Sequence, residues 1–166
     1  LCCIIEDHKP KFIGVTEMLK SSTDYTVHLL KRELEIQLHE LEEQWHFASL
    51  ERIFIENRIY RDIEDEETWQ GVIKAIDLGL QPHIKHLKRA ITEEDIVRLT
   101  EIRIKKISKF DLDKAGQHIA SLEDQIAQVK HNLDNLIDFA INYFKNLKIK
   151  YGKGRERKTL IRTFDT

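Results

Sequence analysis

Residue types that commonly do chemistry occur in this chain, but few are spaced to act together. Glu43 and His46 form one E-x-x-H pair, the unit with which some helix bundles hold iron. A di-iron site needs two such pairs and further glutamates, and no other histidine here has a glutamate three residues before it. His83 and His86 lack an evident third ligand. We therefore expect no metal site.

The sequence also gives little support for a catalytic nucleophile or a phosphate-binding loop. The stretch "YGKGRERK", residues 151–158, lacks the G-x-x-x-x-G-K-[ST] spacing of a phosphate loop. Cys2 and Cys3 are adjacent on an expected strand, where side chains alternate between faces and do not easily bridge. We expect free thiols in a reduced, cytoplasmic setting, no catalytic residue and no cofactor in this segment. No apolar run approaches the length of a membrane span, so no membrane partner is expected.

Positive charge gathers toward the end of the chain. The formal net charge is −2, so any contact with nucleic acid must come from a local patch. Between residues 145 and 162, eight basic residues face one acid, Glu156. This run is either a solvated surface or a surface that contacts DNA phosphates without reading sequence. The DNA-backbone candidates are Lys150, Lys153, Arg155, Arg157 and Lys158.

Two long helices are predicted to carry these groups. Thr16 is the predicted N-cap of the first, and no glycine or proline interrupts residues 17–60. Apolar residues recur there at three- and four-residue steps, which predicts a helix of about forty residues, with Ser21–Asp24 as a candidate kink. A second helix starts after Asp111 and ends at Gly152. It carries a five-repeat heptad pattern with apolar residues at 112, 115, 119, 122, 126, 129, 133, 136, 140, 143 and 147. About fifty residues separate the two, so antiparallel pairing within one chain is the simplest arrangement.

Shorter elements flank and join the two helices. Residues 1–15 read as two strands around a turn at Glu6–Pro10, and "RKTLIRTF", residues 157–164, as a further strand. A helix capped by Asp65 and closed by Gly79 is expected next, then a helical turn with Pro82 at its start. Thr92 is the predicted N-cap of a helix over 93–108, with Glu93 and Glu94 in its first turn.

The helix over 93–108 has more apolar surface than one core requires. On an ideal helix its aliphatic residues span an arc of roughly 220°, and Arg103 falls inside it. Either both apolar surfaces lie inside this chain, or one contacts a second copy around a two-fold axis. Arg103 then pairs within the chain or snorkels, bonds the partner, or contacts DNA. The dimer-interface candidates are Val97, Leu99, Ile102, Arg103 and Ile104.

Two segments resemble the A subunits of bacterial type IIA DNA topoisomerases. The stretch "ITEEDIVRLTEIRIKKISKFD", residues 91–111, is similar to the family pattern L-T-E-x-Q-A-x-x-I-L-x-L-R-L-x-x-L-T-G-L-E. "NYFKNLKIKYGKGRERKT", residues 142–159, resembles the family's helix end and its K-Y-G-x-x-R-x-T segment. Lys109 stands where the family has glycine, Asp95 and Ile96 replace its Q-A pair, and 59–90 has no residue-by-residue match. The matching residues are Ile91, Thr92, Glu93, Leu99, Ile102, Arg103, Ile104, Ile107, Ser108, Phe110, Asp111, Lys150, Tyr151, Gly152, Arg157 and Thr159.

The elements together predict a mainly α fold: a long antiparallel coiled-coil hairpin with a small helical knob at its tip and a short strand-rich base at the termini. The resemblance implies that the knob is a dimerisation domain. It implies a base at 1–25 and 150–166, a coiled coil at 26–58 and 111–149, and an exit-gate domain at 59–110. The family's catalytic tyrosine and its Mg- and ATP-binding sites lie elsewhere in the holoenzyme, and Tyr25, Tyr60, Tyr143 and Tyr151 match no nucleophile pattern.

The implied partners are a second copy, DNA and the ATPase B subunit, in a bacterial, nucleoid-associated cytoplasmic setting. The implied role is that of a non-catalytic segment of an ATP-dependent enzyme that changes DNA topology by double-strand passage. An unrelated coiled-coil homodimeric scaffold or adaptor is the alternative that the residues leave open.

Overall fold

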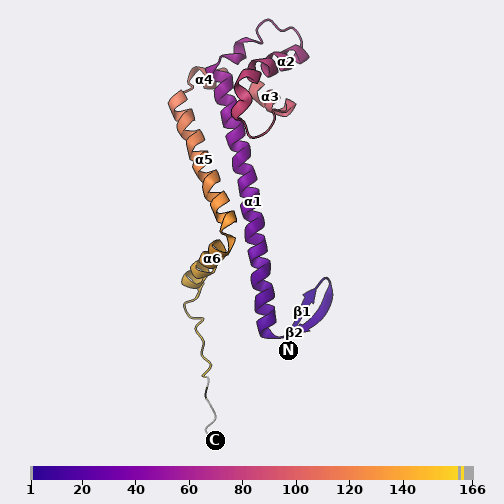
Figure 1. Cartoon of the computed structure of the whole chain (residues 1–166), viewed down its shortest axis with the longest axis vertical. Helices are drawn as coiled ribbons and strands as arrows, with labels where there is room; N and C mark the ends of the chain where they lie inside the picture. Colours follow the sequence, from indigo (N-terminus) through magenta and orange to yellow (C-terminus); the bar gives the residue numbers. More distant parts are fainter. Residues whose placement is uncertain (1, 161, 163–166) are drawn as a thin grey trace. The chain divides into compact units, whose positions relative to one another are not determined.

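The computed structural model describes residues 2–160 and 162, and the predicted mainly α class is confirmed. The chain divides into two compact units. Unit 1 comprises residues 1–35 and 131–166, and unit 2 comprises residues 36–130. The long helix α1, Val15–Glu56, contributes residues to both units (Figure 1).

Helix α1 is the predicted long helix, 42 residues in length. It starts at Val15, one residue before Thr16, the expected cap, and runs without interruption through Ser21–Asp24. Within that stretch the Thr23 hydroxyl donates to the Leu19 carbonyl at 2.8 Å, and Thr26 donates to Ser22 at 2.9 Å. Each hydroxyl is thus satisfied by the preceding turn, so the polar stretch does not end the helix.

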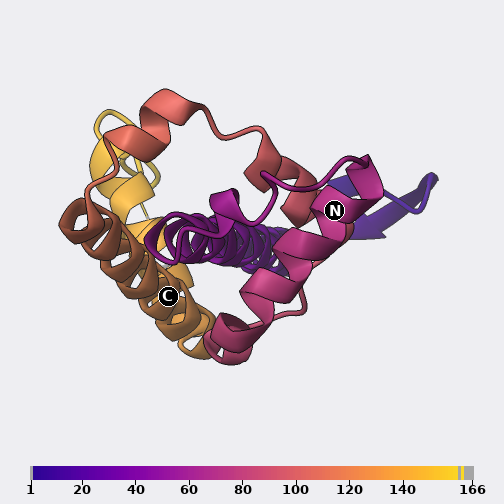
Figure 2. The ribbon, with the colours of Figure 1, turned by 90° about the horizontal axis from the view of Figure 1, so that it is seen from above.

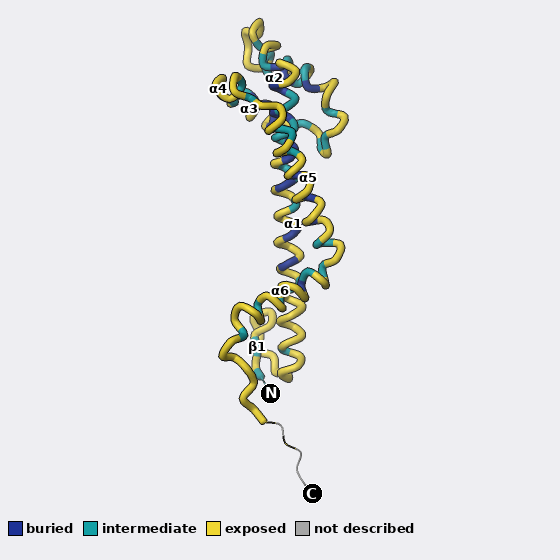
Figure 3. The backbone as a smooth tube through the Cα atoms, turned by 90° about the vertical axis from the view of Figure 1, so that its left-hand side faces the viewer, coloured by how far each residue is buried: buried dark blue, intermediate teal, exposed yellow. Residues whose placement is uncertain are grey.

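Unit 1 begins with the predicted hairpin. Strands β1, Cys2–Glu6, and β2, Lys9–Ile13, pair antiparallel, with Glu6 opposite Lys9. Asp7 and His8 form the two-residue turn with φ of 48° and 63°, the positive values that match the twist of a hairpin. Most of unit 1 is exposed (yellow in Figure 3), and its buried apolar residues are Ile13, Leu30, Leu34 and Ala140.

The second predicted helix is divided into α5, Leu112–Asp134, and α6, Leu136–Tyr151. The expectation of one unbroken helix was therefore wrong. Asn135 separates the two with φ −118° and ψ 46°, and its side-chain amide donates to the His131 carbonyl at 3.0 Å. Asparagine side chains compete in this way for helical backbone groups. The expected cap at Asp111 is confirmed, since its carboxylate accepts from the backbone N–H groups of Asp113 and Lys114.

The C-terminal segment differs from the expected strand. Residues 157–160 and 162 have no strand structure, so the predicted strand is wrong over these residues, and its residues 161, 163 and 164 lie outside the described part of the chain. Gly152 caps α6 with an ordinary φ of −74°. The positive φ, 80°, occurs instead at Gly154.

Within unit 2, α1 and α5 are paired in opposite directions. Lys130 forms an ion pair with Glu42 at 3.2 Å, and the Trp45 indole N–H donates to Glu123 at 3.1 Å. Farther along α1, the Arg52 guanidinium lies beside Gly116. As the residue numbers rise along α1, those of their partners on α5 fall. The predicted antiparallel arrangement is therefore confirmed for these two helices within unit 2. The buried heptad residues of α5 are Leu122, Ile126 and Val129.

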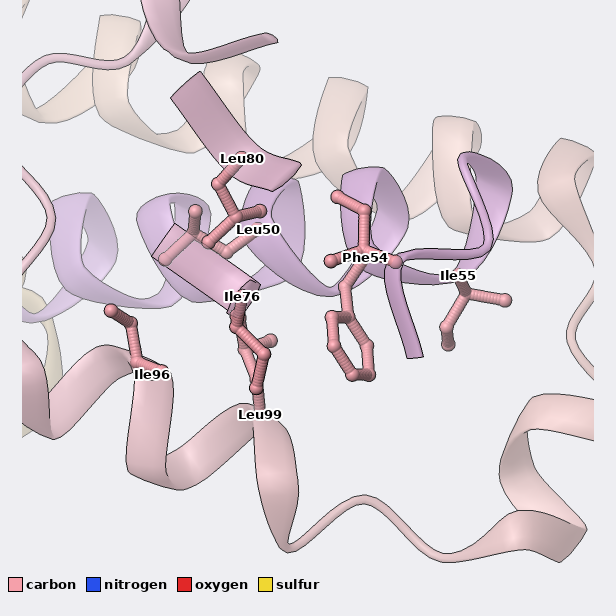
Figure 4. Close-up of a cluster of buried hydrophobic side chains, with 8 residues drawn as sticks. Leu50, Phe54, Ile55, Ile76, Leu80, Ile96 and Leu99 are labelled. Carbon is pink, nitrogen blue, oxygen red and sulfur yellow. The ribbon is translucent and has the colours of Figure 1, made fainter. Parts of the chain in front are cut away.

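Short helices complete unit 2. Figure 2 looks along α1 and shows the other helices of this unit around it: α2 (Trp69–Leu80) in magenta, α3 (Glu93–Thr100) and α4 (Ile104–Ser108) in salmon and α5 in orange. The 3₁₀ turn η1 spans Ile59–Arg61, α2 spans Trp69–Leu80 and the 3₁₀ turn η2 spans Gln81–His86. Their shared core contains Leu50, Phe54, Ile55, Ile59, Ile76, Leu80, Ile96 and Leu99 (Figure 4).

Helix α2 starts and ends later than predicted. Its N-cap is Thr68, not Asp65, because the Thr68 hydroxyl accepts from the Gly71 N–H at 3.1 Å. Gly79 lies inside the helix and does not close it. A Cβ at Gly79 would come within 2.8 Å of the Ile59 side chain, so this glycine permits close packing of η1 against α2. The helical turn with Pro82 at its start is confirmed as η2.

The single helix predicted over 93–108 is two helices. Thr92 caps α3, Glu93–Thr100, as expected, but the chain then leaves the helix and re-enters it at α4, Ile104–Ser108. Arg103 is extended, with φ −69° and ψ 140°. The break turns the chain so that Ile102 and Ile107 both pack against the same core. The helical arc that placed Arg103 among apolar residues therefore does not exist, and its side chain is exposed.

Candidate functional site

A network of charged side chains joins α1 to the start of α3 in unit 2. Asp95 of α3 accepts from His46 Nε2 at 3.1 Å and from Arg89 at 2.7 Å. Arg89 also donates to both carboxylate oxygens of Glu43, at 2.8 and 2.9 Å. His46 is 1% exposed and Asp95 5%. The network thus fixes α3 and the preceding loop against α1, with His46 and Asp95 buried and the Arg89 and Glu43 side chains partly exposed.

Asp95 also takes part in the N-terminal cap of α3. Its carboxylate accepts from the Thr92 N–H at 3.0 Å, while the Thr92 hydroxyl accepts from the Asp95 N–H at 3.3 Å. This is a capping box. Because a carboxylate only accepts, His46 Nε2 carries the shared proton. Among the described residues, His46 Nδ1 has no hydrogen-bond partner.

The charges of the network are strongly stabilised. Burial alone would raise the pKa of Asp95, but hydrogen bonds from Arg89, Thr92 and His46 outweigh it and hold that pKa well below its usual range. The same hydrogen bonds to Asp95 and Glu43 raise the pKa of Arg89. The Arg89 hydrogen bond lowers the pKa of Glu43. All three groups are therefore ionised at neutral pH.

Sequence reasoning missed this network. It considered Glu43 and His46 only as a metal pair, whereas in the structure they bind Arg89 and Asp95. The sequence did contain one signal for Asp95. Thr92-x-x-Asp95 is a variant of the capping-box pattern, and it predicts that the Asp95 carboxylate binds the backbone at the start of this helix. No group of three or more potential metal ligands occurs within residues 2–160 and 162.

The dimer-interface candidates lie in different environments. Leu99 is 1% exposed in the core of its own chain, and Ile102 is partly buried against that core. Val97 is half-buried, whereas Arg103 is exposed and Ile104 is 83% exposed. Among these candidates, Arg103 and Ile104 are therefore the residues that another molecule can reach, and Val97 is partly accessible.

The DNA-backbone candidates follow one another at the C-terminal end. Lys150 lies in the last turn of α6 with its ammonium 5.2 Å from the Tyr151 ring centroid. Lys153, Arg155, Arg157 and Lys158 follow on a segment without helix or strand, and all five side chains are exposed. The only acid among them, Glu156, accepts from the Gly154 N–H at 3.0 Å. Backbone hydrogen bonds lower the pKa of Glu156, so this acid is ionised beside the cations.

Two comparisons with known proteins match this chain over most of its length. The family model that describes the A subunit of DNA gyrase/topoisomerase IV matches residues 1–145. The A subunit of DNA topoisomerase 4 from Borreliella burgdorferi is 29% identical over 158 residues, which cover 95% of this chain. The chain spans 25% of the length of that relative. Within the described residues, no helix is both long and apolar enough to cross a membrane. The family match runs through the hairpin, the whole of α1 and the whole of unit 2, and it places this chain in the family of DNA gyrase/topoisomerase IV A subunits.

Proposed function

We propose that this chain is the coiled-coil and exit-gate dimerisation segment of the A subunit of an ATP-dependent type II DNA topoisomerase. The observation that carries the proposal is the family match over residues 1–145. In this proposal residues 1–25 and 150–166 form a base, 26–58 and 111–149 a coiled coil, and 59–110 the dimerisation domain. The antiparallel contacts between α1 and α5 support the coiled-coil assignment. The core that residues 59–99 form with Leu50, Phe54 and Ile55 of α1 supports a small domain packed on that end of α1.

The proposed segment acts mechanically. Paired helices resist bending, and a small domain with its own core can meet a second copy and separate from it without unfolding. Opening and closing of this contact would let a transported duplex leave during double-strand passage, in decatenation or relaxation. Lys150, Lys153, Arg155, Arg157 and Lys158 would hold DNA phosphates without reading sequence. The catalytic residues, Mg, ATP and the ATPase B subunit would all be bound elsewhere in the holoenzyme, in the cytoplasm at the nucleoid.

Changing Ile104 to glutamate tests the dimerisation role. We expect the dissociation constant of the homodimer to rise at least tenfold, because a charge would have to be desolvated in the contact. Sedimentation velocity over a concentration series measures this constant. The melting temperature should stay near that of the wild type, since the Ile104 side chain is 83% exposed.

Ile149→Glu is the matched control. Ile149 is 81% exposed, carries the same side chain and belongs to unit 1. Its substitution should leave the dissociation constant within about twofold of the wild type, as expected for a surface change away from the contact. A wild-type chain that remains monomeric throughout the series, or equal effects of the two substitutions, would contradict the proposal.

A further inference from the structure

Unit 2 contains an open cavity of 780 Å³ whose rim is strongly basic. Its walls come from α1, the end of α3, the segment 103–111 and the first turns of α5. Six lysine and arginine side chains line it against two carboxylates, those of Glu51 and Asp111. Four partly buried apolar residues also line it, and we call them its apolar floor: Phe47, Ala48, Phe110 and Ala115. The cavity is therefore suited to a ligand with both anionic and apolar parts.

Half of these cations already have partners. Lys106 pairs with Glu51 at 2.7 Å and Lys114 with Asp111 at 3.9 Å. Arg98 stacks 3.9 Å from the Phe47 ring centroid. Arg103, Lys105 and Lys109 have no ion pair among the described residues. These three exposed side chains form an uncompensated positive edge on one side of the cavity.

The backbone brings this edge together at a cost. Lys105 lies in α4 and Lys109 is its C-cap residue, four positions on, with the Lys109 N–H bonded to the Lys105 carbonyl at 3.3 Å. Like charges repel at this spacing on a helical turn. The break before α4 places Arg103 immediately ahead of them. An anion bound here would remove the repulsion and gain charge-assisted hydrogen bonds, so the arrangement favours an anionic ligand.

We propose that this cavity binds a nucleotide unit, with its phosphate on Arg103, Lys105 and Lys109 and its base on the apolar floor beside Phe110. A phosphate alone would leave most of 780 Å³ unfilled, a volume within the range of pockets for whole small ligands. An aromatic floor next to cations suits base stacking with backbone contact. The unit is either a free nucleotide or part of an unpaired nucleic-acid strand, because both present the same chemistry.

The test measures binding in the full chain with the other basic surface neutralised. In this background Lys150, Lys153, Arg155, Arg157 and Lys158 are all changed to glutamine. A labelled single strand of about 12 nucleotides, a length within the range of sites of this kind, is the probe in fluorescence anisotropy. We expect Lys105→Gln/Lys109→Gln to weaken binding at least tenfold and to reduce the slope of log K against log salt by about 1.4. Arg103 is left unchanged because it is also a dimer-interface candidate, and sedimentation velocity of the double variant measures its dimerisation separately.

Lys74→Gln/Lys85→Gln is the matched control, since both lysines are exposed in unit 2 and lie outside this cavity. It removes the same charge and should change affinity less than twofold. Phe110→Leu keeps the site apolar but removes the ring. It should weaken single-strand binding about fivefold or more and leave binding of a duplex of the same sequence unchanged.

Competition in the same glutamine background identifies the source of the ligand without any further substitution. Displacement by adenosine monophosphate, but not by equal inorganic phosphate, indicates a free nucleotide. Displacement by unlabelled strand only indicates nucleic acid. Three results would overturn the proposal. The first is an equal loss of single-strand affinity in the two lysine double variants, and the second is a Phe110→Leu variant that binds single strand like the wild type. The third is competition by polyglutamate as effective as that by nucleotide or strand. None of these outcomes bears on dimerisation, which Ile104→Glu tests separately.

Discussion

Replacing Asp95 by alanine is expected to lower the free energy of unfolding of unit 2 by about 3–5 kcal/mol. The Asp95 side chain is 7% exposed and accepts from His46, Arg89 and the Thr92 N–H. Its removal leaves a buried imidazole N–H and an α3 N-terminus without their acceptor, and such groups cost more unpaired than they contribute when paired. Urea denaturation followed by tryptophan fluorescence measures the change, since both tryptophans, Trp45 and Trp69, belong to unit 2.

Glu94→Ala is the control for Asp95→Ala. Glu94 lies in the same first turn of α3 but is exposed, so it contributes only a helix-dipole interaction of at most about 1 kcal/mol. Asp95→Asn adds a further comparison because it keeps the shape of the side chain and an acceptor oxygen while removing the charge. We expect it to lie between alanine and wild type. If Asp95→Ala cost no more than Glu94→Ala, the network would not hold α3 in place.

The same carboxylate predicts how stability depends on pH. The folded-state pKa of Asp95 is lowered, so the unfolded chain binds more protons in the acid range. The stabilisation from Asp95 is therefore fully present above its unfolded pKa of about 3.9 and is lost as the pH falls through the folded value. Glu43, whose pKa is also lowered, acts in the same direction.

Denaturation of wild type and Asp95→Asn at a series of pH values tests this expectation. The difference in unfolding free energy between the two proteins should be constant near neutrality and shrink below about pH 5. Carboxylates outside the network affect both proteins alike, so their contributions cancel in the difference. A difference that grew on acidification would mean that the folded-state pKa of Asp95 is raised instead.

Local sequence patterns predicted the elements of this chain better than the places where they break. The absence of glycine and proline after Gly14 predicts α1, and Thr92 marks the start of α3 because a cap is a local interaction. Heptad positions 122, 126 and 129 are buried as expected. The break at Asn135 and the break before Arg103 were not predicted. Both breaks lie within stretches where apolar residues recur with a helical period. That period predicts a helix, but it does not predict which part of the protein each apolar residue packs against.

Long-range partners were beyond the reach of local patterns. His46 and Asp95 are 49 residues apart, and nothing in either neighbourhood specifies the other. The basic cavity likewise combines α1 with the segment after α3. Arg103 stood out in the sequence because it fell on an assumed apolar face. The structure gives another reason to single it out, since it is exposed on the rim of that cavity without an ion pair among the described residues.

Changing Leu99 to alanine is expected to lower the free energy of unfolding of unit 2 by about 2–5 kcal/mol. Leu99 is 1% exposed and belongs to the same core as Leu50, Ile76 and Ile96 (Figure 4). The loss combines the hydrophobic transfer of the deleted carbons with the cavity left between these neighbours. Tryptophan fluorescence in urea again measures it.

Ile104→Ala is the matched comparison, because it truncates an aliphatic side chain five positions away that is 83% exposed. We expect it to change stability by about 0.5 kcal/mol or less. Equal destabilisation by Leu99→Ala and Ile104→Ala would contradict the core described here.

Variants at Leu99 and Ile104 also distinguish two causes of weaker dimerisation, unfolding of the chain and loss of the contact itself. A Leu99 variant would weaken association in proportion to the fraction unfolded, so association should recover when the folded state is stabilised. A charged Ile104 variant would weaken association while remaining folded. Only the second result would place the contact on this surface.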